Sequence, residues 1–238
     1  MKIEFIGKSL LIETGKERIL AIGDLHLGYG EGLRRSGVHI PSKTFEFIEK
    51  EIEAILNKVG KVDEVILLGD VKHSFSTIMR DEREEIRKLF LLIKKKAKKI
   101  IIIKGNHDKI LEPIVRNYFI EIKDFYLKES ICFLHGDRDF KEIYNRKIKL
   151  WVMGHAHPAI ELSDGVKRET YKCFLEGKWK GKKIIVLPSF FSVNEGSNIC
   201  LYDLNLAWNF KIESFKAHIV GEGLEVLPFG KVKNLCNN

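Results

Sequence analysis

Five short polar clusters in the sequence contain the residue types that bind metal ions. Gly105-Asn106-His107-Asp108 follows the apolar run 100–103, and four clusters of the same kind follow similar runs elsewhere. Their carboxylate, imidazole and carboxamide groups suit Mn, Fe, Zn or Ni, and no thiolate is among them. The candidate metal ligands are Asp24, His26, Asp70, Asn106, His135, His155 and His157. Seven side chains are too many for one ion, so the pattern predicts two metals that share a bridging carboxylate.

Each cluster lies at the end of a run with the composition of a buried strand. The expected strands are 18–24, 64–70, 99–106, 131–137 and 150–157. The stretches 41–60 and 80–99 carry apolar residues at helical spacing and are predicted helices. This strand–helix alternation predicts an α/β sheet, and such sheets bind ligands beyond the carboxyl ends of their strands. The clusters are therefore expected to meet in one crevice.

The second half of the chain is expected to complete this sheet system. Strand-like segments with short turns predict antiparallel strands there, and the tail from about residue 221 is predicted to be irregular or a last strand. Residues 1–238 contain no linker or repeat, which indicates a single domain.

Composition limits the class of protein. The 238 residues carry a net charge of +8, with no apolar run of transmembrane length and no signal-peptide pattern, so no membrane association and a cytoplasmic location are expected. The positive charge permits an anionic partner. Cysteines 132, 173, 200 and 236 form no C-x-x-C pair. Buried free thiols are expected, rather than disulfides or a cysteine zinc site.

Taken in order, the clusters D-x-H, G-D, G-N-H-D, H-G and G-H-x-H resemble the calcineurin-like metallophosphoesterase superfamily. The resemblance runs from Asp24 to His157 and implies two β-sheets in a sandwich flanked by helices. It also implies the ligands of each metal, with Asp70 as the bridge. One metal would take Asp24, His26, Asp70 and His157, and the other Asp70, Asn106, His135 and His155.

The resemblance implies hydrolysis of a phosphoester by a metal-bridging hydroxide. Two divalent ions are expected, with Mn favoured and Ni, Zn, Fe or Mg as alternatives. His107 would lie beside the substrate phosphate, to stabilise the transition state or protonate the leaving oxygen. Asp108 would orient that loop.

Residues 69–73, "GDVKH", bear on the substrate. The protein phosphatase branch of the superfamily resembles G-D-x-x-D here, whereas His73 matches the branch of DNA-repair nucleases. The sequence also resembles small phosphoesterases associated with DNA ligases or helicases. It therefore implies a phosphodiesterase or nuclease acting on DNA, RNA or a nucleotide, with a possible DNA-repair or helicase partner. A phosphomonoesterase and a catalytically silent metal-binding scaffold are the alternatives.

Other polar features are interpreted more simply. Four basic residues near the clusters are expected either to hold phosphates or to form surface salt bridges: Arg34, Arg35, Lys72 and Arg138. The glycine-rich segment 28–32 is predicted to be a loop near the metals, and 94–99 a solvated helix end. Asp137 and Asp139 are expected to be solvated or structural, and His39 and His218 to lie outside the site.

Overall fold

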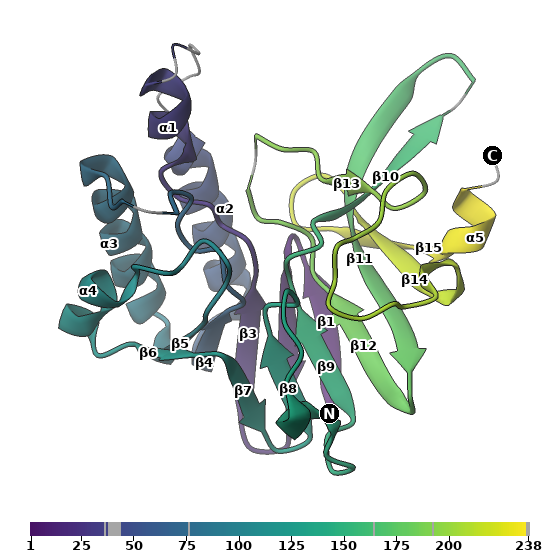
Figure 1. Ribbon diagram of the computed structural model, residues 1–238, viewed down its shortest axis with the longest axis horizontal. Coiled ribbons are helices and arrows are strands. Elements are labelled where there is room, and N and C mark those ends of the chain that lie inside the picture. The colour runs from purple at the N-terminus through teal and green to yellow at the C-terminus, as the bar shows by residue number, and fades with distance from the viewer. Residues whose placement is uncertain (36, 38–43, 76, 164, 192, 237–238) are drawn as a thin grey trace.

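The structure is a computed structural model and describes residues 1–35, 37, 44–75, 77–163, 165–191 and 193–236. Two β-sheets pack face to face, and the longer helices lie on one side of them (Figure 1). This confirms the expected class, a two-sheet sandwich flanked by helices. His39 and the first residues of the expected helix 41–60 lie outside the described residues.

The first sheet has the order β1-β2-β3-β4-β5-β6. Pairing is antiparallel from β1 to β3 and parallel from β3 to β6. Its strands are β1 (Lys2–Ile6), β2 (Ser9–Glu13), β3 (Arg18–Ile22), β4 (Val62–Leu67), β5 (Ala97–Ile103) and β6 (Glu121–Lys123). The parallel strands bring their carboxyl ends to one edge, the same edge that carries three of the five polar clusters.

Strands β3, β4 and β5 are apolar on both faces because both faces are covered, and successive side chains point to opposite faces. Leu20, Val65 and Ile102 point to the helices, whereas Ala21, Ile66 and Ile101 point to the second sheet. The helices on the outer face are α1 (Tyr29–Arg35), α2 (Thr44–Val59), α3 (Arg80–Lys94) and α4 (Glu112–Val115), followed by the short η1 (Arg116–Tyr118). The apolar residues whose helical spacing predicted α2 and α3 are therefore the residues that these helices bury against the sheet.

The second sheet is mixed, with the main order β13-β10-β11-β12-β9-β8-β7, and β14 joins β11 to β15. Its strands are β7 (Phe125–Lys128), β8 (Ile131–Leu134), β9 (Leu150–Met153), β10 (Pro158–Ser163), β11 (Arg168–Trp179), β12 (Lys182–Val186), β13 (Ser197–Asn198), β14 (Lys216–Val220) and β15 (Val226–Lys231). Pairing is antiparallel at β10–β11, β11–β12, β11–β14 and β14–β15. The expectation of antiparallel strands holds for these pairs, but β8, β9 and β12 pair in parallel.

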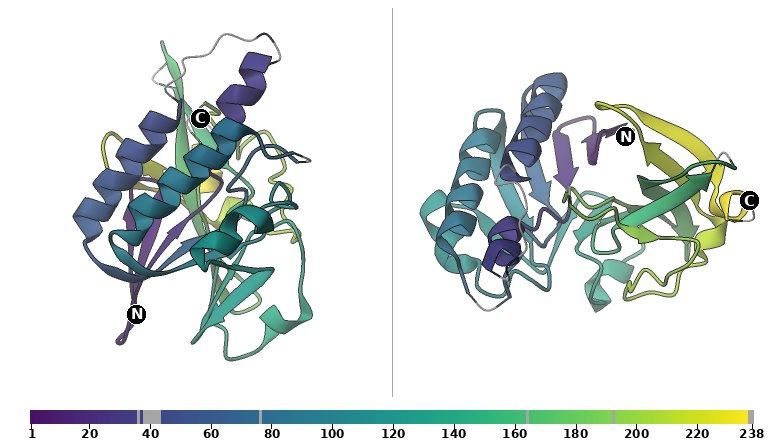
Figure 2. Two further views of the ribbon diagram at one scale, coloured as in Figure 1. Left: turned by 90° about the vertical axis from the view of Figure 1, so that its left-hand side faces the viewer. Right: turned by 90° about the horizontal axis from the view of Figure 1, so that it is seen from above.

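Short elements and irregular chain cover the outer face of the second sheet (Figure 2, right). Trp151 lies at the centre of this layer and packs with Trp208, while Phe210 and Phe215 extend the same cluster. The covering helices are η2 (Lys141–Tyr144), η3 (Ile212–Ser214) and α5 (Val232–Leu235). The tail from about residue 221 thus forms β15 and α5, a last strand and a short helix.

Three local predictions are wrong. Segment 28–32 is mostly helical, because α1 begins at Tyr29. Segment 94–99 is not one helix end: α3 ends at Lys94 and β5 begins at Ala97, where parallel pairing with β4 takes over. The five expected strands stop two to four residues early, so the polar clusters lie in the loops that follow them.

The cysteine prediction holds for two residues and fails for two. Cys132 and Cys173 are buried free thiols, but Cys200 and Cys236 form a disulfide. The disulfide ties the segment after β13 to the end of α5, two parts of the chain that the sequence alone does not place together. None of the described helices is both long and apolar enough to span a membrane.

Candidate metal centre

Backbone hydrogen bonds join the loops after β3 and β4 to each other and the loops after β8 and β9 to each other, and the N–H of His155 donates to Oδ1 of Asp24 at 3.1 Å, which links the two pairs. The N–H of Asp24 donates to the carbonyl of Gly69 at 3.2 Å, and the N–H of His26 donates to that of Asp70 at 2.8 Å. In the second sheet the N–H of Gly154 donates to the carbonyl of His135 at 2.9 Å. The two sheets therefore deliver their polar clusters to one place, as the sequence predicted.

Most of the candidate ligands have a backbone conformation that side chains rarely adopt. Left-handed φ angles between 46° and 66° occur at Asp24, His26, Asp70, His155 and His157. Each such residue costs of order 1 kcal/mol or more and persists only where its surroundings enforce it. The shared feature is a sharp kink directly after a strand, which turns these side chains toward a common centre.

Glycine is required at three positions because the side chains of the cluster pass directly over the backbone. A Cβ at Gly69 would overlap with the His135 imidazole, and one at Gly105 would overlap with the Asp70 carboxylate. At Gly154 it would lie 2.5 Å from the Asp24 carboxylate. The side chains of the cluster thus lie directly against backbone atoms, which explains why glycines accompany the polar residues in the sequence.

The first group of side chains comes from the loops after β3 and β9. The Nε2 atom of His157 lies 3.2 Å from Oδ1 of Asp24 and 3.4 Å from Nε2 of His26. The potential ligand atoms of these three residues all lie within 4.8 Å of one another. Such a group of one carboxylate and two imidazoles has the size and donor types of a divalent metal site.

The second group comes from the loops after β4, β5, β8 and β9. The Nε2 atom of His135 lies 3.1 Å from Oδ1 of Asn106 and 3.1 Å from Nδ1 of His155. The Nδ1–H of His135 donates to the carbonyl of Leu68 at 2.7 Å, which turns Nε2 toward the cluster. Asp70, His135 and His155 again offer ligand atoms within 4.8 Å of one another.

Asp70 lies between the two groups. Its Oδ2 atom is 3.8 Å from Nε2 of His26 in the first group and 3.5 Å from Nε2 of His135 in the second. A single carboxylate oxygen therefore faces both sets of nitrogens.

The electrostatics of the cluster fit divalent cations. Burial lowers the pKa of His26 to about 3, and burial together with the nearby His135 lowers the pKa of His155, so both imidazoles are neutral and able to bind metal. Burial opposes a charge on His135, but its hydrogen bond to Asp70 and the charges of Asp70 and Asp24 raise its pKa to about 10. The Nδ1 atom of His26 is buried and has no hydrogen-bond partner among the described residues. The buried carboxylates Asp24 and Asp70 thus favour positive charge beside them, and without a metal a proton on His135 supplies it.

His107 is held beside the cluster by its neighbours. Its Nδ1–H donates to the backbone carbonyl of His73 at 2.5 Å, so Nε2 is the nitrogen that faces Oδ2 of Asp70, 3.9 Å away. The N–H of His107 donates to Oδ1 of the same carboxylate at 2.9 Å. Phe75, half exposed, packs against the ring with a centroid separation of 3.7 Å.

His73 and Asp108 occupy different surroundings. His73 lies with His26 and His107 in a third group of potential ligand atoms, and burial and the nearby His107 lower its pKa. Asp108 is buried and accepts hydrogen bonds from the N–H groups of Gly105, Val71 and Lys72. Burial raises the pKa of Asp108 to about 7. Its carboxylate thus joins the loop after β4 to the loop after β5, in line with an orienting role.

The four basic residues that were expected to hold phosphates or to form salt bridges have different surroundings. Arg34 lies 3.7 Å from Asp81, and Arg138 pairs with Asp124 at 3.1 Å, so both take part in salt bridges. Lys72 is buried, and its Nζ donates to the carbonyl of Thr77. The side chain of Arg35 lies outside the described part of the chain.

Asp137 and Asp139, which were expected to be solvated or structural, make local contacts, and His218 lies outside the site. Asp139 accepts a hydrogen bond from Tyr144, and Asp137 pairs with Arg138 at 3.4 Å. His218 contacts Glu176 on β11 and belongs to no group of potential metal ligands among the described residues.

Three residues that position the site were not found from the sequence. Glu82 on α3 is fully buried and accepts hydrogen bonds from the N–H groups of His73 and Ser74. Ser189 donates through Oγ to the carbonyl of Asp24 at 3.1 Å, and Lys172 donates to the carbonyl of Ser189 at 2.9 Å. The only signal for Ser189 was the "LPSF" segment, and its contact with Asp24 spans 165 positions in the sequence.

Comparison with known proteins gives the class to which this fold and site belong. A sequence model of the calcineurin-like phosphoesterase family matches residues 17–178, more than half of the chain. The chain therefore belongs to the calcineurin-like phosphoesterase family, and it is a metal-dependent phosphoesterase. The match spans all seven candidate ligands.

Solved structures add to the description of the fold. Nuclease MPE of Pseudomonas putida has a TM-score of 0.62 at 18% identity, with 96% of this chain and 99% of that chain covered, so the two share a fold. A protein of unknown function from Aquifex aeolicus is 23% identical, with a TM-score of 0.40 over 58% of this chain and 77% of that one. A single-site variant of Vps29 from Entamoeba histolytica is 14% identical, with a TM-score of 0.38 over 89% and 99%. No curated protein sequence matches this chain.

Proposed function

We propose that this protein is a two-metal phosphodiesterase that hydrolyses nucleic acid or a nucleotide. The observation that carries the proposal is the position of Asp70, whose Oδ2 atom faces imidazole nitrogens of both ligand groups at 3.8 and 3.5 Å. One metal would be held by Asp24, His26, Asp70 and His157, and the other by Asp70, Asn106, His135 and His155. Manganese is the proposed ion, because carboxylate and carboxamide oxygens suit it, and Ni, Zn, Fe and Mg are the alternatives.

The metal ions and the residues around them would have different roles in the reaction. When bound, paired divalent ions activate water and neutralise charge on the phosphoryl oxygens. His107 presents Nε2 to the phosphate or to the leaving oxygen, because its Nδ1–H donates to the His73 carbonyl, and in its protonated form it would donate from Nε2. Asp108 holds the loop that carries Asn106 and His107, and His73 contacts the substrate from the other side of His107.

Three observations support a phosphodiester over a phosphomonoester. His73, rather than an aspartate, lies next to His107, with ring centroids 5.3 Å apart. The chain carries a net charge of +8. The structural neighbour from Pseudomonas putida is described as a nuclease. We propose DNA or RNA as the substrate and a DNA-repair or helicase protein as the class of partner.

The test is hydrolysis of bis-p-nitrophenyl phosphate in the presence of added Mn. Asp70→Asn should lower kcat/KM at least about 100-fold together with the bound metal content. His107→Ala should lower kcat about 10²–10⁴-fold while the metal content stays unchanged. His218→Ala is the matched control, since its imidazole contacts Glu176 and Phe5 and belongs to no group of potential metal ligands among the described residues.

A substrate panel with Mn then separates the alternatives. It compares single-stranded DNA, double-stranded DNA, RNA, cyclic nucleotides and phosphomonoesters. Preference for monoesters would overturn the proposed role of His73. Bound metal without turnover of any ester, with Mn, Ni, Zn, Fe or Mg, would favour a scaffold and contradict the proposal.

A further inference from the structure

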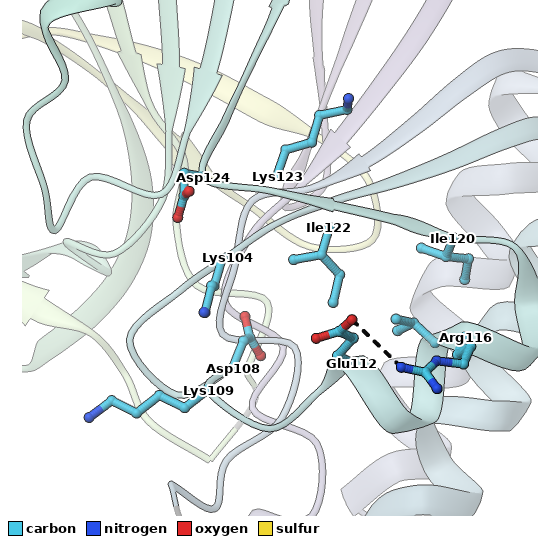
Figure 3. Close-up of a pocket in the computed structure, with 10 residues that line it drawn as sticks. Lys104, Asp108, Lys109, Glu112, Arg116, Ile120, Ile122, Lys123 and Asp124 are labelled. Carbon is cyan, nitrogen blue, oxygen red and sulfur yellow. Dashed lines mark ion pairs between the residues drawn. The ribbon is translucent and has the colours of Figure 1, made fainter.

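A cavity lies beside the loop that carries Asn106 and His107. It has a volume of about 520 Å³ and is lined by the loop after β5, by α4 and η1, and by β6 with the residue that follows it (Figure 3). Asp108, the residue after His107, forms part of its wall. The cavity and the candidate metal centre thus share the loop 105–108.

The floor of this cavity is apolar and its rim is basic. Val115, Ile120 and Ile122 form the apolar part. Lys104 and Lys109 stand at the rim, directly before and directly after the sequence Gly105–Asp108. A volume of this size is within the range of small-ligand sites, roughly 300–1,000 Å³.

The acidic side chains that line the cavity are all engaged. Asp108 accepts backbone N–H groups, Glu112 pairs with Arg116 at 3.9 Å, and Asp124 pairs with Arg138 at 3.1 Å. By contrast, the ammonium groups of Lys104 and Lys109 make no hydrogen bond or ion pair with any described residue. The charge left available to a ligand is therefore positive.

We infer that this cavity is a nucleotide subsite, which holds one nucleotide of a substrate strand beside the phosphodiester being cleaved. This rests on the proposed function. Lys104 and Lys109 bind the phosphate of that nucleotide, and the isoleucine side chains contact the face of its base. A cation would be repelled by the free ammonium groups, and an apolar ligand would leave them unpaired.

The test compares a Lys104→Ala/Lys109→Ala double variant with the unaltered protein on two substrates, an eight-nucleotide single-stranded DNA and bis-p-nitrophenyl phosphate. The ratio of kcat/KM for the oligonucleotide to kcat/KM for the small ester should fall at least about tenfold, through KM. Lys50→Ala/Lys95→Ala is the matched control, because it removes the same charge from exposed positions on α2 and at the end of α3. Its ratio should stay within about twofold.

Direct binding gives a readout that does not depend on turnover. The affinity for a fluorescently labelled oligonucleotide is measured by anisotropy in EDTA at several salt concentrations. Loss of the one phosphate that both lysines contact should reduce the slope of log K against log salt by about 0.7, the value for one neutralised phosphate on a single strand. Lys104→Arg/Lys109→Arg should keep most of the binding, since the charge is kept.

The outcomes separate this inference from the proposed function. An unchanged ratio and salt slope in the double alanine variant would overturn the subsite while hydrolysis of the small ester continues. An equal loss on both substrates would also overturn it, because the lysines would then act at the metal centre. Failure of the unaltered protein to hydrolyse any ester would instead contradict the proposed function, and the anisotropy slope would still decide whether the cavity binds a strand.

Discussion

Asp70 and His107 are joined twice. The backbone N–H of His107 donates to Oδ1 of Asp70 at 2.9 Å, and Nε2 of His107 lies 3.9 Å from Oδ2 of the same carboxylate. One carboxylate thus fixes the backbone of the loop after β5 and also faces the nitrogens of both ligand groups. A change at Asp70 should therefore affect metal binding and the position of the imidazole together, whereas His107→Ala keeps the backbone N–H that contacts Asp70.

Gly105→Ala should damage the site through close packing alone. The added Cβ would overlap with the Asp70 carboxylate, and relief requires a backbone shift that costs on the order of 1–3 kcal/mol. We expect at least a tenfold lower kcat/KM and a reduced metal content by elemental analysis. Gly15→Ala is the control, because nothing lies within 4 Å of a Cβ there. Equal behaviour of the two variants would show that the loop has more room than the structure gives it.

Removal of metal should lower the unfolding temperature. A ligand that binds only the folded state at about 100 times its dissociation constant stabilises that state by about 2.7 kcal/mol. We therefore expect EDTA treatment to lower the Tm by roughly 5–10 °C, and added Mn to restore it. Thermal unfolding followed by circular dichroism measures this shift. Asp70→Asn should lose most of it, and a full shift in that variant would argue against Asp70 as a ligand.

Glu82→Gln should loosen the segment that carries His73 and Phe75. Oε1 of Glu82 accepts the N–H groups of His73 and Ser74 at 3.1 and 3.0 Å, and Oε2 accepts that of Met79 at 3.3 Å. The amide of a glutamine can accept on one side only, so at least one of these part-buried donors loses its acceptor. The expected loss is about 1–3 kcal/mol in the free energy of unfolding, measured by denaturant titration. Glu84→Gln on the exposed side of α3 should stay within about 0.5 kcal/mol.

The ion-pair cluster on β11 should make part of the stability depend on pH. Burial tends to raise the pKa of Glu176, but hydrogen bonds and charges of Lys183 and His218 lower it below its ordinary value of 4.5. A lowered folded-state pKa adds stability above the unfolded-state pKa, and this is lost as the pH falls through the folded-state value.

Glu176→Gln should therefore lower the Tm at pH 7 by about 1–3 °C, allowing for solvent screening of a partly exposed pair. The difference from the unaltered protein should shrink below pH 4.5. Calorimetry at pH 7 and pH 3.5 measures both, with the exposed Glu213→Gln as the control. A difference that grows on acidification would contradict the assignment.

Reduction of the Cys200–Cys236 disulfide should destabilise the C-terminal layer. The bond closes a loop with a sequence separation of 36 residues, and the chain-entropy model gives on the order of 3–4 kcal/mol for such a loop. We expect dithiothreitol to lower the Tm by roughly 10 °C. The Cys200→Ser/Cys236→Ser variant should have the Tm of the reduced protein, and dithiothreitol should not change it. Detection of four free thiols in the unreduced, denatured protein would rule the bond out.

The sequence by itself determined the identity of the candidate ligands and the local elements that precede them. The apolar alternation of β3, β4 and β5 and the stripes of α2 and α3 are local patterns, so they could be read along the chain. The order of the five clusters was sufficient to indicate the family, and the sandwich class followed from it.

Tertiary structure decided which side chains meet. His157 contacts Asp24 across a gap of 133 positions, and His135 contacts Asn106 from the other sheet, because strand neighbours are chosen by non-local pairing. The positioning residues Glu82, Ser189 and Lys172 became visible only through such contacts. The disulfide and the short α1 were also beyond the sequence, since packing against distant elements overrides weak local preference.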